Sequence, residues 1–222
     1  ININNKNHML CGAAHFKSIR NQYKQSSYDL YKALKEFVDN IITKCDKINI
    51  KLDIHDNKLY QITISDNYIC GFKDINEEYE NNPFNMGHIR SGQSNNEELS
   101  QFGIGFKAGT ISTANKLEVY TKVEDNYYEV IMDMNEMCKE PDVMKSYNPK
   151  KYLIDESKYK DKHIFDTGST IVLSNLHNDI YPSTNEESCV KDILFDLSNC
   201  YGKMIEKKNK KLLVNGKNIT PP

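Results

Sequence analysis

Apolar residues repeat along this chain at two spacings, and each spacing predicts one kind of element. In residues 27–46 they recur three and four positions apart, which is the pattern of a helix with one buried face. The same pattern predicts a second long helix over residues 186–208. The apolar stripe of the first helix consists of Leu30, Ala33, Leu34, Phe37, Val38, Ile41 and Cys45.

Strict alternation of apolar and polar residues, or a run of β-branched residues bounded by turn signals, predicts strands between and after these helices. Turns with Asn, Asp or Gly separate the paired strands. The predicted strands lie at residues 48–54, 59–65 and 168–176. A hairpin is predicted over residues 117–134, and a short one through Asn215-Gly216 in residues 210–222. We therefore expect an α+β fold, a two-layer sandwich with a mixed, largely antiparallel sheet and helices on one face.

Three polar segments lack such periodicity. We expect residues 1–26 to form an N-terminal arm and residues 135–167 to form an irregular insertion. Residues 73–101 predict a long loop with one short helical piece, and a loop of that length in a compact domain is usually a functional lid or disordered. A soft boundary near residue 183 divides a main domain, residues 27–183, from a tail, residues 184–222.

Composition narrows the class of protein. A length of 222 residues suits one main domain, and a formal net charge of −2 argues against a general polyanion binder. No apolar run reaches the roughly 18 residues of a membrane span, and the first residues lack the form of a signal peptide, so we expect an intracellular protein. The chain does not begin with Met, which indicates an excised fragment. Six cysteines without a CxxC pair are expected to be reduced, mostly packing thiols.

Two polar residues flank the apolar stripe of the first helix. Glu36 and Asn40 are four positions apart, so a carboxylate and an amide oxygen project from the same face and can hold a metal ion and a water. The competing interpretation is that Glu36, Asp39 and Asn40 form the solvated edge of an ordinary amphipathic helix.

A second candidate site lies where two glycines precede a helical segment. Gly103 and Gly105 in QFGIGFKAG place backbone N–H groups at a helix start, which is an anion site. Asp66 and Asn67 come directly after a predicted strand, where a ligand can be read.

Other kinds of site fit the sequence poorly. The segment GIGFKAG is one residue off the dinucleotide fingerprint and follows a loop where that fingerprint needs a strand. No Walker P-loop, zinc-ligand spacing or nucleophile elbow is present. The lysines at 207, 208, 210 and 211 are more typical of a solvated helix end than of a nucleic-acid patch.

The ordered set EFVDN, a strand ending in DN, a lid leading to QFGIGFK, and a strand starting GS resembles the GHKL ATPases of the Bergerat fold. This group includes gyrase, MutL, histidine kinases, the large heat-shock chaperone and the Morc proteins. The resemblance covers roughly residues 27–180. FNMGHIRSGQ and SQFGIGFKAG look most like the chaperone lid, and GFKAG and STIVLSNL look closest to the Morc branch.

The resemblance implies that ATP and Mg²⁺ are the cofactors. Glu36 would be the general base that activates the attacking water, and Asn40 would supply an oxygen ligand to Mg²⁺. Asn85 matches a lid position near the ribose and phosphates. Gly103 and Gly105, with the amides of Ile104 and Phe106, would hold phosphate, and Lys107 would add charge there or at the lid.

At the adenine end, the resemblance implies that Asp66 accepts a hydrogen bond from the adenine amine and that Ser169 supports it in place of the usual Thr. Asn67 and Gly71 belong to the same motif. The usual D-x-G-x-G becomes Asp66-Asn67-Tyr68-Ile69-Cys70-Gly71, so the first glycine is missing and the second comes one residue late. Thr43 also stands where an aspartate is common.

The sequence thus predicts a module that binds and hydrolyses ATP and whose lid closure and dimerisation drive a larger clamp-like machine. The alternative is a nucleotide-gated dimerisation scaffold with little or no turnover. Residues 184–222 would then begin a transducer-like domain or linker. The client, either DNA or chromatin or a protein substrate, is left open.

Overall fold

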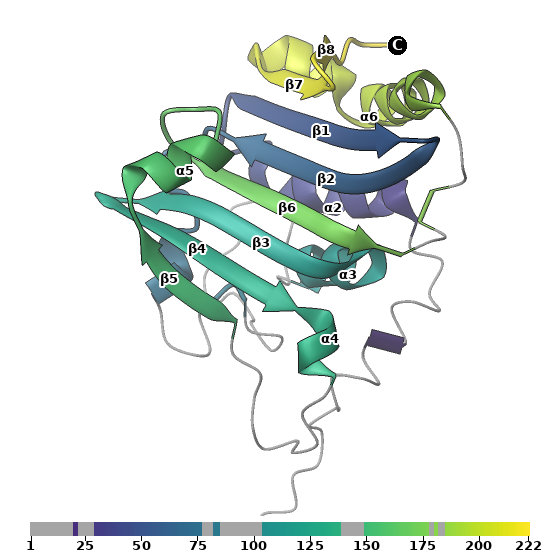
Figure 1. Ribbon diagram of the computed structural model, residues 1–222. Coiled ribbons are helices and arrows are strands. Elements are labelled where there is room, and N and C mark those ends of the chain that lie inside the picture. The colour runs from purple at the N-terminus through teal and green to yellow at the C-terminus, as the bar shows by residue number, and fades with distance from the viewer. Residues whose placement is uncertain are drawn as a thin grey trace, which may run out of the picture.

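The computed structural model describes residues 20–21, 29–76, 82–84, 104–138, 149–177, 180–181 and 185–222. Its helices surround one continuous sheet (Figure 1). The helices are α2 (Leu30–Ile41), the 3-10 helix η1 (Lys73–Asn76), α3 (Ile104–Thr113), α4 (Met134–Met137), α5 (Glu156–Lys162) and α6 (Glu186–Lys208). The strands are β1 (Lys47–His55), β2 (Lys58–Asp66), β3 (Ala114–Val123), β4 (Asn126–Asp133), β5 (Lys150–Ile154), β6 (Ser169–Leu176), β7 (Lys211–Val214) and β8 (Lys217–Asn218).

The eight strands form a mixed sheet in the order β5-β4-β3-β6-β2-β1-β7-β8. Every neighbouring pair is antiparallel except β1 with β7, which is parallel. Helices α2 and α3 lie behind this sheet in the view of Figure 1. The predicted α+β sandwich with a largely antiparallel sheet is therefore confirmed.

Helix α2 forms where its apolar stripe predicts it. Asp29 is its N-cap and accepts a hydrogen bond from the Lys32 amide at 2.8 Å, which satisfies one of the amides left without a partner in the first turn. Its buried face packs with the inward-facing residues of the strands in one core. Ile42, just past the helix end, is buried there, whereas Ile41 is only partly buried.

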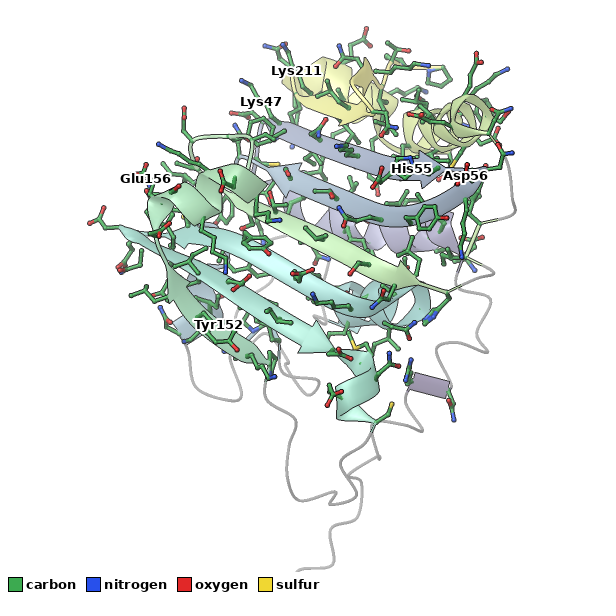
Figure 2. The ribbon with its side chains drawn as sticks, viewed as in Figure 1. Lys47, His55, Asp56, Tyr152, Glu156 and Lys211 are labelled. Carbon is green, nitrogen blue, oxygen red and sulfur yellow. The ribbon has the colours of Figure 1, made fainter. Side chains whose placement is uncertain are left out.

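The interpretation of residues 135–167 as irregular is wrong, because they include β5 and α5. Edge strand β5 is exposed along most of its length, so its sequence shows no alternation. Helix α5 is short and has Asp155 as its N-cap and one buried residue, Tyr159, so it shows no periodicity. Tyr159 packs on Tyr120 and Val172, which place α5 on the sheet face opposite α2 and α3. Figure 2 marks this end of the sheet with Tyr152 and Glu156.

The tail after residue 184 extends the same sheet. Lys47 in β1 is paired with Lys211 in β7, and the two side chains are labelled at the start of these strands in Figure 2. Helix α6 buries residues that include Ile193, Leu197 and Tyr201 in the same core as α2. The domain boundary expected near residue 183 thus falls between elements that share one sheet and one core.

The described cysteines are five free thiols. Cys45 and Cys189 are buried as expected for packing residues, Cys138 is partly buried, and Cys70 and Cys200 are exposed. Within the described ranges, no helix combines the length and the apolar character that a membrane crossing requires.

Candidate functional site: a carboxylate beside a helix start and a buried aspartate

Glu36 and Asn40 lie on one flank of α2, and both are partly exposed. The Asn40 side-chain nitrogen donates to the backbone carbonyl of Glu36. This bond holds the amide along the turn that carries Glu36 and leaves Oδ1 as the end that can serve as a metal ligand. The structure therefore keeps the two groups adjacent, as their spacing predicts.

The Glu36 carboxylate rests against the backbone of α3. A Cβ built on Gly105 would overlap Oε2 and the carboxyl carbon of Glu36, whereas Oε1, at 3.5 Å, would be in ordinary contact. One turn later, a Cβ on Gly109 would lie 3.4 Å from Cε2 of Phe37. The absence of a side chain at Gly105 is therefore what lets α3 approach the Glu36 carboxylate so closely, whereas position 109 has room for a Cβ.

Gly105 lies in the first turn of α3, where amide groups lack intrahelical acceptors. Such a helix start attracts anions because free N–H groups and the helix dipole act together. The carboxylate of Glu36 therefore lies beside a backbone suited to phosphate. Gly103 and Asn85 lie outside the described residues, and Ile104 is described only as the first residue of α3.

Phe106 has a structural side chain. It is 8% exposed and forms an aromatic cluster in which ring centroids lie 5.7 Å from Phe37, 5.9 Å from Phe72 and 6.0 Å from Phe84. The cluster joins α2, α3 and the segment after β2. Any contact of Phe106 with phosphate must therefore come from its amide, as the resemblance implies.

Lys107 is a buried basic residue. Its side chain is 3% exposed, and its ammonium has no hydrogen-bond partner among the described residues. Burial lowers the pKa of Lys107 to about 8. Two positions along a helix correspond to about 200°, so Lys107 leaves α3 on the side away from Gly105 and Glu36. A contact between Lys107 and phosphate stays a prediction.

Asp66, the last residue of β2, is the second centre of the site. It is 3% exposed and accepts a hydrogen bond from the Tyr68 amide at 2.8 Å, and a second one from the backbone of Ser169. Burial raises the pKa of Asp66 to about 7 despite these bonds, since desolvation disfavours the charged form. A carboxylate held in this way is a strong acceptor for one amine donor.

Gly168 explains how β6 comes so close to Asp66. Its φ of +113° lies in the region that favours glycine, and a Cβ there would overlap the Asp66 carbonyl oxygen. Asp66 is consequently paired with Ser169 in the β2–β6 ladder. Gly168 thus allows the close approach of the two strands, and Ser169 pairs with Asp66.

Ser169 belongs to a buried hydroxyl pair that sequence reasoning missed. Its Oγ lies 2.7 Å from Thr121 Oγ1, and the Phe72 amide donates to that same Thr121 oxygen at 3.0 Å. Gly71, with φ of +52°, packs directly on Thr121 and the Lys122 carbonyl. Thr121 is fully buried and faces inward from β3. Because buried polar groups require partners, a hydroxyl among the inward-facing residues of this strand could have indicated such a pair.

Asn67 has a structural contact. Its side-chain oxygen accepts hydrogen bonds from the amides of Asp46 and Lys47, at 3.0 and 2.8 Å. These bonds fasten the end of β2 to the start of β1 and so hold Asp66 in place. A contact between Asn67 and nucleotide stays a prediction.

The chain belongs to the family of histidine kinase-, DNA gyrase B- and HSP90-like ATPases, whose model matches residues 28–164. This confirms the predicted GHKL superfamily and supports the binding of ATP. No curated protein matches the chain. The matched region begins just before α2, includes Glu36, Asp66 and Gly105, and ends before β6 and α6.

The residues present also fit the magnesium that such a nucleotide carries. No group of three or more His, Cys, Asp or Glu side chains suited to a metal ion occurs in the described ranges. Mg²⁺ is commonly held by substrate phosphates, waters and one or two protein oxygens. Asn40, one turn from Glu36 on the same flank of α2, can provide such an oxygen.

Proposed function

We propose that this protein is a slow Mg²⁺-dependent ATPase. The observation that carries the proposal is the contact between the Glu36 carboxylate and the backbone of Gly105, which puts a general base beside an anion-binding helix start. Asp66 accepts the adenine amine at the other end of the site, and Ser169 and Thr121 support it.

The proposed reaction is the in-line attack of water on the γ-phosphoryl group. Such a reaction depends mainly on positioning and on neutralisation of charge. Glu36 orients the water and accepts its proton, and the first amides of α3 hold phosphate oxygens. Bound Mg²⁺ would neutralise phosphate charge, with Asn40 as its protein ligand.

The test compares the wild-type chain with Glu36→Ala. Both should bind a non-hydrolysable ATP analogue in calorimetry, because Glu36 acts in the chemical step. Turnover in the variant should fall on the order of a hundred- to ten-thousand-fold, as expected for loss of a general base. No binding by either protein at millimolar nucleotide would contradict the proposal. Binding by both, with equally slow hydrolysis, would favour the nucleotide-gated scaffold.

We further propose that nucleotide promotes a homodimer through the N-terminal arm, in a larger clamp-like machine of the Morc or chaperone kind. ATP can drive such a change only if it binds the closed, paired form more tightly than the open form. Light scattering during the same analogue titration should show a dimer population that is lost when residues 1–20 are deleted. An unchanged mass at saturation would contradict this part. The proposed client is DNA, chromatin or a protein substrate.

A further inference from the structure

The helix that carries Glu36 has three occupied faces. One face packs in the core, and a second carries Asn40 together with Glu36, whose carboxylate lies against α3. The third carries Lys35 and Asp39, about 100° around the helix from Glu36 and Asn40. It faces α6, which lies outside the part of the chain matched by the ATPase family.

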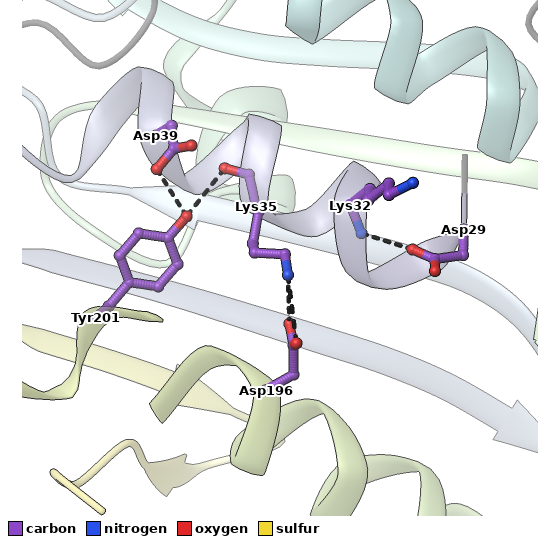
Figure 3. A network of polar contacts seen from close by, with 6 residues as sticks. All are labelled: Asp29, Lys32, Lys35, Asp39, Asp196 and Tyr201. Atoms are coloured by element: carbon purple, nitrogen blue, oxygen red, sulfur yellow. Dashed lines mark hydrogen bonds and ion pairs between the residues drawn. The ribbon is translucent and has the colours of Figure 1, made fainter. Parts of the chain in front are cut away.

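Tyr201 of α6 reaches across to this third face (Figure 3). Its hydroxyl donates to Oδ1 of Asp39 at 2.7 Å and also lies 3.3 Å from the backbone carbonyl of Lys35. One hydroxyl thus touches both ends of the single turn, residues 35–39, that contains Glu36. Tyr201 is 4% exposed, so water competes little for its hydroxyl.

An ion pair holds the same turn from a second point of α6. Lys35 Nζ lies 3.2 Å from one carboxylate oxygen of Asp196 and donates to the other at 3.3 Å. Both side chains are 29% exposed, so this pair is weaker than a buried one. The buried bond between Tyr201 and Asp39 is therefore the stronger constraint on the turn.

The local electrostatics explain why that bond matters to Asp39. Asp39 is partly buried, Tyr201 donates to it, and Glu36 lies three positions before it on the same helix. Without the hydroxyl, Asp39 would be a half-buried carboxylate close to a second one. Its side chain would then be expected to turn toward solvent and the turn to relax.

We propose that Tyr201 is a positioning residue for the ATPase reaction, which acts through Asp39 to hold the turn of α2 that aims Glu36 at Gly105. The proposal rests on the function proposed above. It makes α6 part of the catalytic unit: movement of α6 would change the aim of Glu36 without any contact between α6 and nucleotide.

The experiment measures kcat and KM for ATP, together with the affinity for a non-hydrolysable analogue. Tyr201→Phe removes only the hydroxyl and should lower kcat on the order of tenfold, less than the hundredfold that a misplacement of about 1 Å can cause. KM and analogue affinity should stay within about twofold, because Tyr201 is assigned no contact with nucleotide. A loss of folding alone would instead lower the active fraction, which analogue titration counts.

Two further variants identify the route of the effect. Asp39→Asn keeps an oxygen acceptor for Tyr201 and should retain most of the turnover, whereas Asp39→Leu should lower kcat as much as Tyr201→Phe. The double variant Tyr201→Phe/Asp39→Leu should be no slower than either single variant, since both remove the same bond. Additive losses would overturn the proposed route.

Tyr120→Phe is the matched control. Tyr120 is 3% exposed and lies on the other face of the sheet, where its hydroxyl donates to Glu118 at 3.3 Å. Removal of this hydroxyl should leave kcat unchanged. Equal kcat for Tyr201→Phe and wild type, in a protein whose turnover depends on Glu36, would overturn the positioning role alone. Wild-type turnover no faster than that of Glu36→Ala would overturn the ATPase proposal and this one with it.

Discussion

Asp66 is a buried titratable residue, and its ionisation lowers the stability of the folded protein. Its pKa rises from 3.8 to about 7 in the folded protein. Between these values the folded chain holds a proton that the unfolded chain has lost. The free energy of unfolding therefore falls as pH rises from about 4 to 7, by up to roughly 4 kcal/mol for a shift of about three pKa units.

Asp66→Asn removes this ionisation. We expect the variant to gain stability relative to wild type as pH rises from 5 to about 8, because only the wild type must bury a charge there. Urea unfolding at the two pH values measures the difference. The variant should also lose nucleotide binding, since an amide donor then faces the adenine amine.

Asp125→Asn, in the exposed turn between β3 and β4, is the control for this comparison. It should leave the pH dependence of unfolding as it is in the wild type. An Asp66→Asn variant with the wild-type pH dependence would mean that Asp66 is ionised at little cost, and unchanged nucleotide affinity would mean that adenine binds elsewhere.

At the scale of elements, the packing of α3 on α2 brings Gly105 against the Glu36 carboxylate. Gly105→Ala should leave the fold intact, because alanine favours a helix by up to about 1 kcal/mol over glycine and the displaced group is the end of a flexible side chain. The new Cβ must, however, push the Glu36 carboxylate from its place. Turnover should fall at least about a hundredfold, while the affinity for analogue falls less.

Gly109→Ala provides the matched control in the same helix. Its Cβ would lie 3.4 Å from Phe37 Cε2 and 3.5 Å from the Ala33 carbonyl, so a small shift of the ring accommodates it. It should keep near wild-type turnover and equal or higher thermal stability. If Gly105→Ala hydrolyses ATP as well as Gly109→Ala, then Glu36 does not act from the position seen here.

At the scale of the whole molecule, deletion of the tail, residues 184–222, tests where the folding unit ends. A chain that stops at residue 183 would expose the edge of β1 and lose α6, whose residues are packed in the core beside α2. We expect it to show no cooperative thermal transition, because burial of apolar area provides most of the stability of such a domain. Circular dichroism during heating measures this.

A substitution on the outer side of α6 serves as the control. Phe195 is 69% exposed, so Phe195→Ser should leave the transition near its wild-type temperature. Cooperative unfolding of residues 1–183 would instead support the boundary that the sequence suggests and would make residues 184–222 a separate unit.

Periodic segments could be predicted from the sequence by themselves. Helices α2 and α6 and strands β1, β2 and β6 lie close to where their apolar spacing places them, because a regular element buries one face and the spacing shows that face directly. The order of short motifs also predicted the GHKL superfamily, which the family model confirms. Strand β5 and helix α5 were missed. The strand is exposed along most of its length and the helix buries one residue, so neither shows a periodic apolar pattern.

What the sequence determined was which residues are buried and which polar groups stand beside them. Only the tertiary structure decided what covers them: Gly105 against Glu36, Thr121 against Ser169, and Tyr201 against Asp39. The physical reason is that periodicity depends on neighbours within one element, whereas each of these contacts joins elements far apart in the chain. Their pairing follows from the strand order and helix packing of the whole fold, in which the parallel β1–β7 pair draws α6 onto the helix that carries Glu36.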